Sequence, residues 1–569
     1  MIHKSHPLGQ AIVLICLALC VAFRLHAIFG TDPLLLAASI EDDSFYYTVP
    51  AFKWVETGFV TFDGINKTYG WQPLWMLVNM GVALLVRDIG AVLQWTMAAA
   101  TGLYALSVWL LYRFALRLRM SPVAAGAAIA CMFCFNLQMC EIFTRGKENA
   151  LHFFLLMVLL NLWSNGLKLS LPRAAVSGLL IGMLALARVT AGIVVVPFAL
   201  VTLWAFKGIN RNSIQTLAAT GIAALLVAVP WFLFAQGEFG SFLPTSGVAK
   251  IASGGGLIHH RPDIFTRDTL VTFGRGLQIV KDLGLEYYWQ SGFSRVVKWG
   301  VACLPVALAI SLAIAMAGAW RNRRKHIRPA ASPAAEALAI LVGYALLNFL
   351  LHTTMLRNYF FYGVWYHVPE YAALAIGICW MASRTLDSLG CDQPLRPSGL
   401  RFLYIGIVFA VLLWASYPYT MRIRFGMFLP RVNAVALSID DARPFIQQHI
   451  PPGTVIASSN SGIFGFLLPN YCIVNLDGLA NSMEYVRATH QGLDATRAFL
   501  RQLNIRYIMD SEDLDWIGTR GFMEIVFPDE YQILWTGHRE IWWGAKEVQG
   551  TPKFTFILQL EDDAFTPRP

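Results

Sequence analysis

The stretch TLAATGIAALLVAVPWFLFA, residues 216–235, runs for twenty residues without a charged side chain. A helix of about 20 apolar residues spans the hydrocarbon core of a bilayer and satisfies its own backbone hydrogen bonds there. Comparable apolar runs occupy residues 11–23, 174–187 and 301–320. This repetition predicts an integral membrane protein that crosses the bilayer many times.

The composition of the whole chain agrees with that prediction. The 569 residues are 56% hydrophobic and 14% charged, with a mean hydropathy of +0.53, whereas soluble domains carry about 25% charged residues. The net charge of +9 does not indicate a nucleic-acid partner, because the basic residues lie in short loops between apolar runs. Short basic loops are typical of the cytoplasmic side of a membrane.

These basic loops also set the expected topology. With the N-terminus in the cytoplasm, the basic loops fall inside only if the short apolar segment at residues 72–86 lies along the outer interface instead of crossing. The fold class is then an all-α polytopic membrane bundle of about 11 transmembrane helices plus a juxtamembrane helix. The expected spans are residues 8–30, 91–112, 121–140, 149–165, 175–190, 191–206, 214–236, 298–319, 335–352, 361–383 and 402–419.

The spans define a transmembrane domain at residues 1–419 and a tail at residues 420–569 that lies outside the membrane. The tail is predicted to be a soluble α/β domain, because short segments with strand patterns and helix patterns follow one another in it. Its expected helices are residues 440–450 and 493–503, and its expected strands are residues 454–457, 472–475, 506–509 and 554–558. The outer loops at residues 31–90 and 237–297 face the same side as this tail, so chemistry is expected at the outer membrane boundary.

The first candidate site is the acidic segment that follows the first span. Asp42 and Asp43 stand together there, before the aromatic residues Phe45, Tyr46 and Tyr47. Neighbouring acids at a low-dielectric boundary repel each other, which raises the pKa of one of them. A carboxylate at this place is suited to accept a proton from a hydroxyl group. The alternatives are a solvated acidic loop and an N-cap of the following helix.

Two further motifs lie near the same boundary. Gly70, Gln72 and Trp75 belong to a segment that predicts a tight turn into an interfacial helix, or alternatively a simple membrane anchor. Arg188 ends an apolar run and needs an anionic partner, which is either a carboxylate or a lipid phosphate. The alternative for Arg188 is a side chain that snorkels to the surface.

Two other loops carry cations on the outer side. Thr245, Ser246 and Lys250 follow a span and suit an oxyanion, unless they form an ordinary turn with a solvated lysine. Arg357, with Trp365 and Tyr366, again pairs a cation with aromatic side chains, for which an aromatic belt is the competing interpretation. Acids, cations and aromatics thus gather on one side of an apolar bundle. A lipid-linked phosphosugar needs such a surface.

In these motifs and their order, the sequence resembles the GT-C superfamily of membrane glycosyltransferases, which take sugars from polyprenyl-phosphate donors. The acidic pair Asp42-Asp43 matches the pair in the first outer loop of that superfamily. The closer resemblance is to bacterial terminal arabinofuranosyltransferases. It rests on the turn at residues 70–75, on Ala187-Arg188 at the end of a span and on the loop at residues 243–250.

The resemblance implies inverting transfer of a sugar from a polyprenyl-phosphate donor to a cell-envelope glycan or lipid, at the outer face of a bacterial cytoplasmic membrane. Asp43 or Asp42 would act as the base. Arg188, Lys250 or Arg357 would stabilise the departing lipid phosphate. The expected donor- or acceptor-binding residues are Tyr46, Gln72, Thr245, Ser246, Trp365 and Tyr366. Paired carboxylates also suit Mg²⁺ or Mn²⁺, which makes Asp42 and Asp43 candidate metal ligands as well.

Two other classes of function remain as alternatives. A transporter or flippase of lipid-linked sugars should show internal symmetry and polar groups near the middle of the membrane. The sequence places its polar groups at the outer ends of the spans instead. A non-catalytic envelope assembly protein would not need the acids after the first span.

Overall fold

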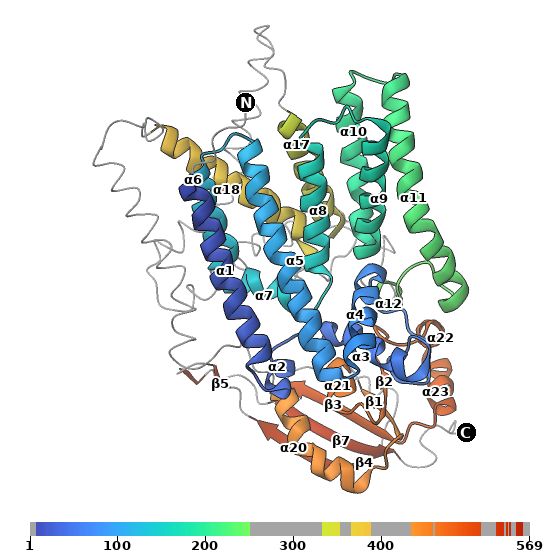
Figure 1. Ribbon diagram of the computed structural model, residues 1–569. Coiled ribbons are helices and arrows are strands. Elements are labelled where there is room, and N and C mark those ends of the chain that lie inside the picture. Colours follow the sequence, from blue (N-terminus) through green and yellow to red (C-terminus); the bar gives the residue numbers. More distant parts are fainter. Residues whose placement is uncertain are drawn as a thin grey trace, which may run out of the picture.

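The computed structural model of the chain describes residues 7–250, 333–352, 366–388, 434–458, 461–513, 531–539, 542–543, 546–547 and 553–560. The predicted spans at residues 298–319 and 402–419 lie outside the described residues, and so do Arg357 and Trp365. The described part is mostly helical, with a bundle of helices above a small β-sheet (Figure 1).

Among the described residues, four helices are long and apolar enough to cross a membrane. They are α1 (Pro7–Phe29), α5 (Ile89–Arg117), α11 (Arg211–Phe239) and α17 (Pro333–Leu350). The shorter helices of the bundle are α6 (Pro122–Ile129) with a π-helical turn at Ala130–Cys134, α7 (Leu137–Thr144), α8 (Asn149–Trp163), α9 (Leu171–Ala187), α10 (Val195–Ala205) and α18 (Val368–Ser388). The predicted spans inside the described residues coincide with these bundle helices, while the number of crossings stays a prediction.

The segment predicted to lie along the interface is helix α4 (Pro73–Val86). Its 14 residues extend about 21 Å at 1.5 Å per residue, which is short of the ~30 Å hydrocarbon core. Pro73 suits the first turn of the helix because its missing N–H would have no partner there. Because α8, at 15 residues, is almost equally short, the interfacial position of α4 stays a prediction.

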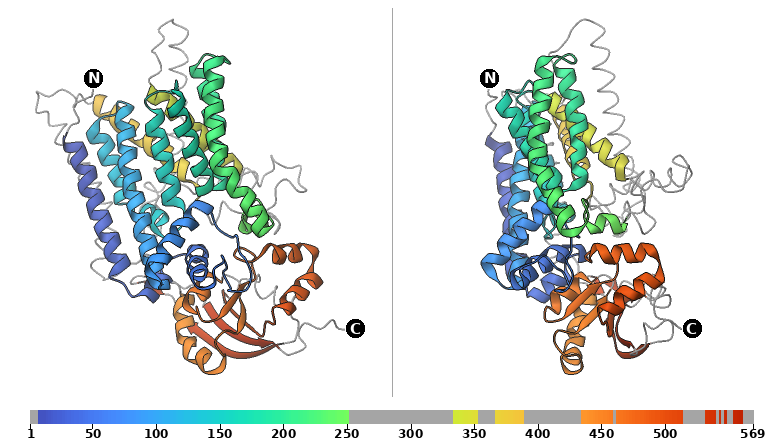
Figure 2. Two further views of the ribbon diagram at one scale, coloured as in Figure 1. Left: turned by 45° about the vertical axis from the view of Figure 1, so that its right-hand side comes forward. Right: turned by 90° about the vertical axis from the view of Figure 1, so that its right-hand side faces the viewer.

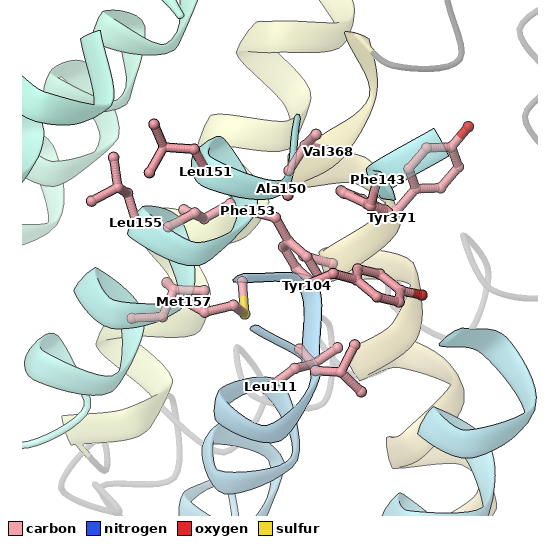
Figure 3. Close-up of a cluster of buried hydrophobic side chains, with 14 of the residues drawn as sticks. Tyr104, Leu111, Phe143, Ala150, Leu151, Phe153, Leu155, Met157, Val368 and Tyr371 are labelled. Atoms are coloured by element: carbon pink, nitrogen blue, oxygen red, sulfur yellow. The ribbon is translucent and has the colours of Figure 1, made fainter. Parts of the chain in front are cut away.

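The centre of the bundle is a cluster of aromatic and aliphatic side chains (Figure 3). Tyr104 of α5 stacks on Phe143 of α7 with ring centroids 5.2 Å apart, and Phe143 lies 4.9 Å from Phe153 of α8. Val368 and Tyr371 of α18 lie beside these rings in Figure 3. Aromatic pairs at these distances add about 0.5–1.5 kcal/mol each beyond the burial of their area.

The C-terminal residues form a five-stranded sheet with the order β2-β1-β3-β7-β4. Strands β1 (Val455–Ser458), β2 (Cys472–Asn475) and β3 (Tyr507–Asp513) are parallel, and β7 (Lys553–Leu560) and β4 (Tyr531–Arg539) continue the sheet antiparallel. A separate pair joins β5 (Trp542–Trp543) to β6 (Lys546–Glu547). The residues predicted as strands coincide with β1, β2, β3 and β7.

Short helices connect the parallel strands, as parallel pairing requires. Helix α21 (Gly462–Leu467) lies between β1 and β2, whereas α22 (Met483–Gln491) and α23 (Leu493–Gln502) lie between β2 and β3. Helix α20 (Ala434–His449) precedes β1 and packs on β4 and β7. The carboxyl ends of β1 and β2 therefore meet at one edge of the sheet, where ligand sites commonly form in parallel sheets.

This sheet unit shares a hydrophobic core with the segment that follows the first long helix. Helices α2 (Pro33–Ala38) and α3 (Asp42–Thr57) pack against α20 and α21, and both figures place them between the bundle and the sheet (Figures 1 and 2). Phe45 of α3 lies 5.0 Å from Phe466 of α21, between ring centroids. One buried cluster includes side chains from α2, α3, α20, α21 and β1. Helices α2 and α3 and the sheet unit are thus packed as one body.

At Gly70, the segment between α3 and α4 comes very close to the backbone of the sheet unit. A Cβ atom on Gly70 would lie 2.0 Å from the carbonyl oxygen of Leu479, which is closer than real contacts allow. We expect Gly70→Ala to destabilise the packing of the sheet unit by about 1–3 kcal/mol, because a backbone oxygen cannot move aside freely. The measurement is the thermal unfolding midpoint, with limited proteolysis of the C-terminal residues.

The matched control is Gly81→Ala in helix α4, where an added Cβ meets no atom within 4 Å. Alanine in a helix interior is neutral or stabilising. Equal thermal midpoints and equal proteolysis of the two variants would contradict the close approach at Gly70.

Candidate active site

The acidic segment predicted as the site forms the start of helix α3. Glu41 precedes the helix in an extended conformation, and Asp42 and Asp43 lie in its first turn. Carboxylates are favourable at this position because the free N–H groups of the first turn carry partial positive charge. The helix ends at Gly58, whose φ of 80° is the left-handed conformation that favours glycine. The local sequence therefore presents three successive acids on a rigid element.

The first of these acids, Glu41, is held by cations from the loop between α7 and α8. Arg145 Nη1 lies 2.8 Å from Glu41 Oε1, and Lys147 Nζ pairs with Glu41 Oε2. Arg145 also pairs with Glu141 at 3.1 Å. Burial acts to raise the pKa of Glu41, but the attraction of Lys147 and Arg145 outweighs it and holds that pKa below its ordinary value. Glu41 is thereby fixed as a structural anion.

The second acid, Asp42, is held by the sheet unit. Its Oδ1 accepts a hydrogen bond from the backbone N–H of Ile463 at 2.8 Å, and its Oδ2 accepts one from Gly462 N–H at 3.1 Å. The hydroxyl of Tyr46, one turn along α3, donates to Oδ2 at 2.7 Å. Burial raises the pKa of Asp42 to about 7, with the three hydrogen bonds acting in the opposite direction and the charge of Asp477 adding to the rise.

The third acid, Asp43, differs from its two neighbours. Like Glu41 and Asp42 it is partly exposed, but its side chain makes no hydrogen bond or ion pair with any residue that the structure describes. The adjacent Tyr46 is buried, and its hydroxyl lies 3.4 Å from Asp477 Oδ2. Asp43 is thus the one acid of the three whose carboxylate is available to another molecule in the described part of the chain.

Asp477 and its neighbours come from the carboxyl ends of the parallel strands. Asn475 ends β2 and donates from Nδ2 to Ser461 Oγ at 2.8 Å, next to α21, which supplies the two N–H groups for Asp42. Asp477 Oδ1 accepts the N–H of Leu479 at 2.9 Å, which fixes its loop. Burial raises the pKa of the Tyr46 hydroxyl, and the charges of Asp42, Asp477 and Asp43 add to the rise.

A second polar network joins Tyr47 of α3 to the start of α8 and the end of α9. Tyr47 of α3 donates from its hydroxyl to Glu148 Oε2 at 2.8 Å. Glu148 Oε1 lies 3.1 Å from Arg188 Nη1, and both side chains are buried. Glu148 precedes α8 and Arg188 ends α9, so the ion pair is made where two helices stop. The Arg188 guanidinium also lies 4.2 Å above the ring centroid of Tyr366.

The structure brings only some of the predicted site residues together. Asp42, Asp43 and Tyr46 share the start of α3, and Arg188 and Tyr366 contact each other. Gln72 contacts the Arg188 region through its side chain, because its Oε1 accepts the N–H of Val189 at 3.1 Å.

The remaining predicted residues lie in or near α12 (Thr245–Lys250) or outside the described range. The N–H of Thr245 bonds to Tyr69 O at 2.8 Å, and its buried hydroxyl has no hydrogen-bond partner among the described residues. Ser246 is partly exposed. The side chain of Lys250 and all of Arg357 and Trp365 lie outside what the structure describes.

Sequence reasoning missed the charged loop that pairs with Glu41 and Arg188. Residues 141–148, EIFTRGKE, hold four charges between two apolar runs, and that density was the available signal. It also missed Asn475 and Asp477 as neighbours of the acidic pair. Their contact depends on a fold that joins residues more than 400 positions apart.

Part of the acidic group is unsuited to a metal ion. The carboxylate of Asp42 already accepts three hydrogen bonds, whose donors point at the oxygens that a cation would need. Within the described residues there is no group of three or more histidine, cysteine or acidic side chains arranged to hold a metal. Asp43 alone of the pair keeps its oxygens available as ligands.

Comparison with known proteins gives a match to one family and to several solved structures, among them one of an oligosaccharyltransferase and two of ArnT. Residues 432–556 match the family described as a domain of unknown function, DUF8728. No curated protein matches the chain significantly. The oligosaccharyltransferase of Archaeoglobus fulgidus, in complex with Zn and sulfate, is 13% identical over 88% of this chain and 68% of its own, with a TM-score of 0.49.

The two other structures are of ArnT from Cupriavidus metallidurans. The form bound to undecaprenyl phosphate is 15% identical over 97% of this chain and 99% of its own, with a TM-score of 0.42. The apo form is 14% identical over 98% and 100%, with a TM-score of 0.42. Because all three scores are below 0.5, these similarities carry no argument about the activity of this chain.

The raised pKa of Asp42 predicts a specific pH dependence of stability. Between the ordinary pKa of 3.8 and about 7, the folded protein holds a proton that the unfolded chain releases, so stability falls as pH rises through this window and is level above it. Asp42→Asn removes the titration. We expect the thermal midpoint of the wild type to fall relative to that of Asp42→Asn as pH rises from about 4 to about 7.

Asp494→Asn is a suitable control, because Asp494 is an exposed acid in the first turn of α23. Its pH profile should follow the wild type. Identical pH profiles of the wild type and Asp42→Asn would show that the Asp42 carboxyl does not titrate in this window.

Proposed function

We propose that this protein is a glycosyltransferase that moves a sugar from a polyprenyl-phosphate donor to an acceptor hydroxyl at the outer face of the membrane. The observation that carries the proposal is the division of roles among the three acids of α3. Glu41 is paired with cations and Asp42 with backbone N–H groups, which leaves Asp43 free to take a proton. The apolar helices and the resemblance of the sequence motifs support the same function.

In this proposal Asp43 removes the proton of the acceptor hydroxyl as its oxygen attacks the anomeric carbon of the donor sugar. The bond from that carbon to the lipid phosphate breaks, and configuration inverts. Arg188 stabilises the departing phosphate, with Lys250 and Arg357 as further candidates. The acceptor is a cell-envelope glycan or lipid, and the C-terminal residues 420–569 form an extracytoplasmic domain beside the site. A divalent ion bound by Asp43 would add charge stabilisation.

The position of the acids favours this function over a transporter of lipid-linked sugars, because α3 lies between the bundle and the sheet (Figures 1 and 2). Glu148 lies at the start of α8, Arg188 at the end of α9 and His367 immediately before α18. A transporter site near the middle of the bundle would instead be formed by broken helices at that depth.

Asp43→Asn tests the proposed base, since asparagine keeps the shape of the side chain but cannot take the proton. A positioned base contributes about 10²–10⁴-fold, so transfer should fall by that factor. The measurement is glycan and lipid mass spectrometry of a deletion strain that expresses each variant. The variant strain should lack one sugar on its glycan and accumulate the polyprenyl-linked donor.

Glu56→Gln is the matched control, because Glu56 is an exposed acid at the other end of α3. It should restore the wild-type glycan. Full restoration by Asp43→Asn at normal membrane abundance would remove Asp43 from the mechanism. Loss of wild-type transfer in the presence of a chelator would show that a metal ion takes part, and unchanged transfer would leave Asp43 as the base alone.

Arg188→Lys tests the proposed phosphate contact while it keeps the charge. Lysine lacks the planar fork of donors and cannot lie flat on Tyr366 as the guanidinium does. Hydrogen bonds to charged groups contribute about 1.5–3 kcal/mol, so affinity for a polyprenyl phosphate should fall by about 10–100-fold. Arg443→Lys, in an exposed ion pair with Asp440, is the control. Equal affinity in both variants would place the phosphate elsewhere.

A further inference from the structure

His352 is a buried imidazole without a hydrogen-bond partner among the described residues. It follows α17 and its side chain is 1% exposed. Neither of its ring nitrogens makes a hydrogen bond with any residue that the structure describes. An imidazole carries at least one N–H donor in every protonation state, and an unpaired buried donor costs about 1–3 kcal/mol. Such a group is expected where a molecule from outside the chain supplies the acceptor.

The His352 imidazole lies against other aromatic rings. Its ring centroid lies 4.8 Å from that of Tyr366 and 6.3 Å from that of His367. The Arg188 guanidinium lies 4.2 Å from the centroid of the same Tyr366 ring. His352 and Arg188 therefore both contact one aromatic side chain, and the positive charge of Arg188 makes a metal cation an unfavourable occupant.

The nearby acids are engaged with other groups. Glu148 pairs with Arg188 at 3.1 Å, and Glu370 accepts a hydrogen bond from Asn348 at 2.9 Å and lies 3.7 Å from His367. A third imidazole, that of His152, bonds to the Tyr344 hydroxyl through Nε2 at 2.9 Å, while its buried Nδ1 has no hydrogen-bond partner among the described residues. Unpaired nitrogen atoms beside a guanidinium suit an anion with several acceptor oxygens.

We propose that His352, together with Arg188, binds the phosphate oxygens of the polyprenyl-phosphate donor. This inference rests on the proposed function, and it assigns to the phosphate site a residue that sequence motifs do not indicate. His352 lies where α17 ends, beside the apolar interior of the bundle. A lipid phosphate could place its charged group there while its chain remains in an apolar environment.

Two substitutions at His352 test the proposal in the full-length protein in detergent. His352→Phe keeps a flat ring against Tyr366 but has no donor, and His352→Asn keeps one amide donor. We expect His352→Phe to bind a polyprenyl phosphate at least 10-fold more weakly than the wild type, and His352→Asn to lie between them. His449→Phe, the same change at an exposed histidine of α20, should bind like the wild type.

Thermal unfolding without ligand separates a binding role from a structural one. Removal of an unpaired buried imidazole should leave the midpoint of His352→Phe unchanged or higher, whereas loss of a structural contact would lower it. Wild-type affinity in His352→Phe would overturn the proposal. An equal loss of affinity for polyprenyl phosphate in His352→Phe and His352→Asn, together with a lowered thermal midpoint, would also overturn it.

Inorganic phosphate distinguishes the source of the anion. Weaker binding of both inorganic and polyprenyl phosphate by His352→Phe would support recognition of the phosphate group itself. An effect on the polyprenyl phosphate alone would support recognition of the lipid carrier.

The binding measurement needs no catalysis, so it remains decisive if the protein proves not to transfer sugar. Conversely, Asp43→Asn should bind the polyprenyl phosphate normally. The failure of His352 as a phosphate ligand can therefore be told apart from the failure of Asp43 as the base.

Discussion

The Asp42 carboxylate connects two parts of the chain that are 420 residues apart in sequence, because it accepts the N–H groups of Gly462 and Ile463. Both N–H groups belong to the first turn of α21, where backbone donors have no partner within the helix. One side chain thus satisfies unpaired donors of a short buried helix and fixes the start of α3 against the sheet. The shared hydrophobic core, with Phe45 against Phe466, holds the two parts at the distance that these hydrogen bonds need.

A second constraint follows from the cost of burying charge at a low-dielectric boundary. Each buried acid in this region must be paired or hydrogen-bonded, and each buried cation needs an anion. The buried Glu148 meets that requirement with Arg188 and Tyr47, and the partly exposed Glu41 is paired with Arg145 and Lys147. Asp43 is partly exposed like Glu41 but has no partner among the described residues, and its exposure lowers the cost of leaving the carboxylate unpaired.

The sequence could predict the parts of the fold that depend on local pattern. Apolar runs predicted the bundle helices such as α1 and α11, and alternation with turn residues predicted β2 at residues 472–475. The site was predictable only in part. The importance of Asp42 and Asp43 follows from their position after the first span, but their division of roles depends on Arg145, Lys147 and α21. Those contacts join segments that are far apart in the sequence, so the spacing of residues within the acidic motif cannot predict them. For the same reason the sequence does not indicate His352, because its lack of a hydrogen-bond partner among the described residues depends on the folded surroundings.

The two polar networks are linked through helix α3. This link affects how well the proposed base and the proposed phosphate site are held at a fixed distance from each other. Asp43 and Tyr47 are one turn apart on α3, and the Tyr47 hydroxyl donates to the carboxylate that holds Arg188. The N–H of Gln72 donates to the same hydroxyl at 3.1 Å, while the Gln72 side chain accepts the N–H of Val189 next to Arg188. Two hydrogen-bonded paths therefore run from α3 to the end of α9.

Reaction geometry tolerates displacements of well under 1 Å at the reacting atoms. Side chains that are fixed by such contacts keep functional groups within that limit better than groups on separate loops do. The distance between the proposed base and the guanidinium is thus set by short, buried contacts, and the sheet unit fixes the other side of α3 through Asp42.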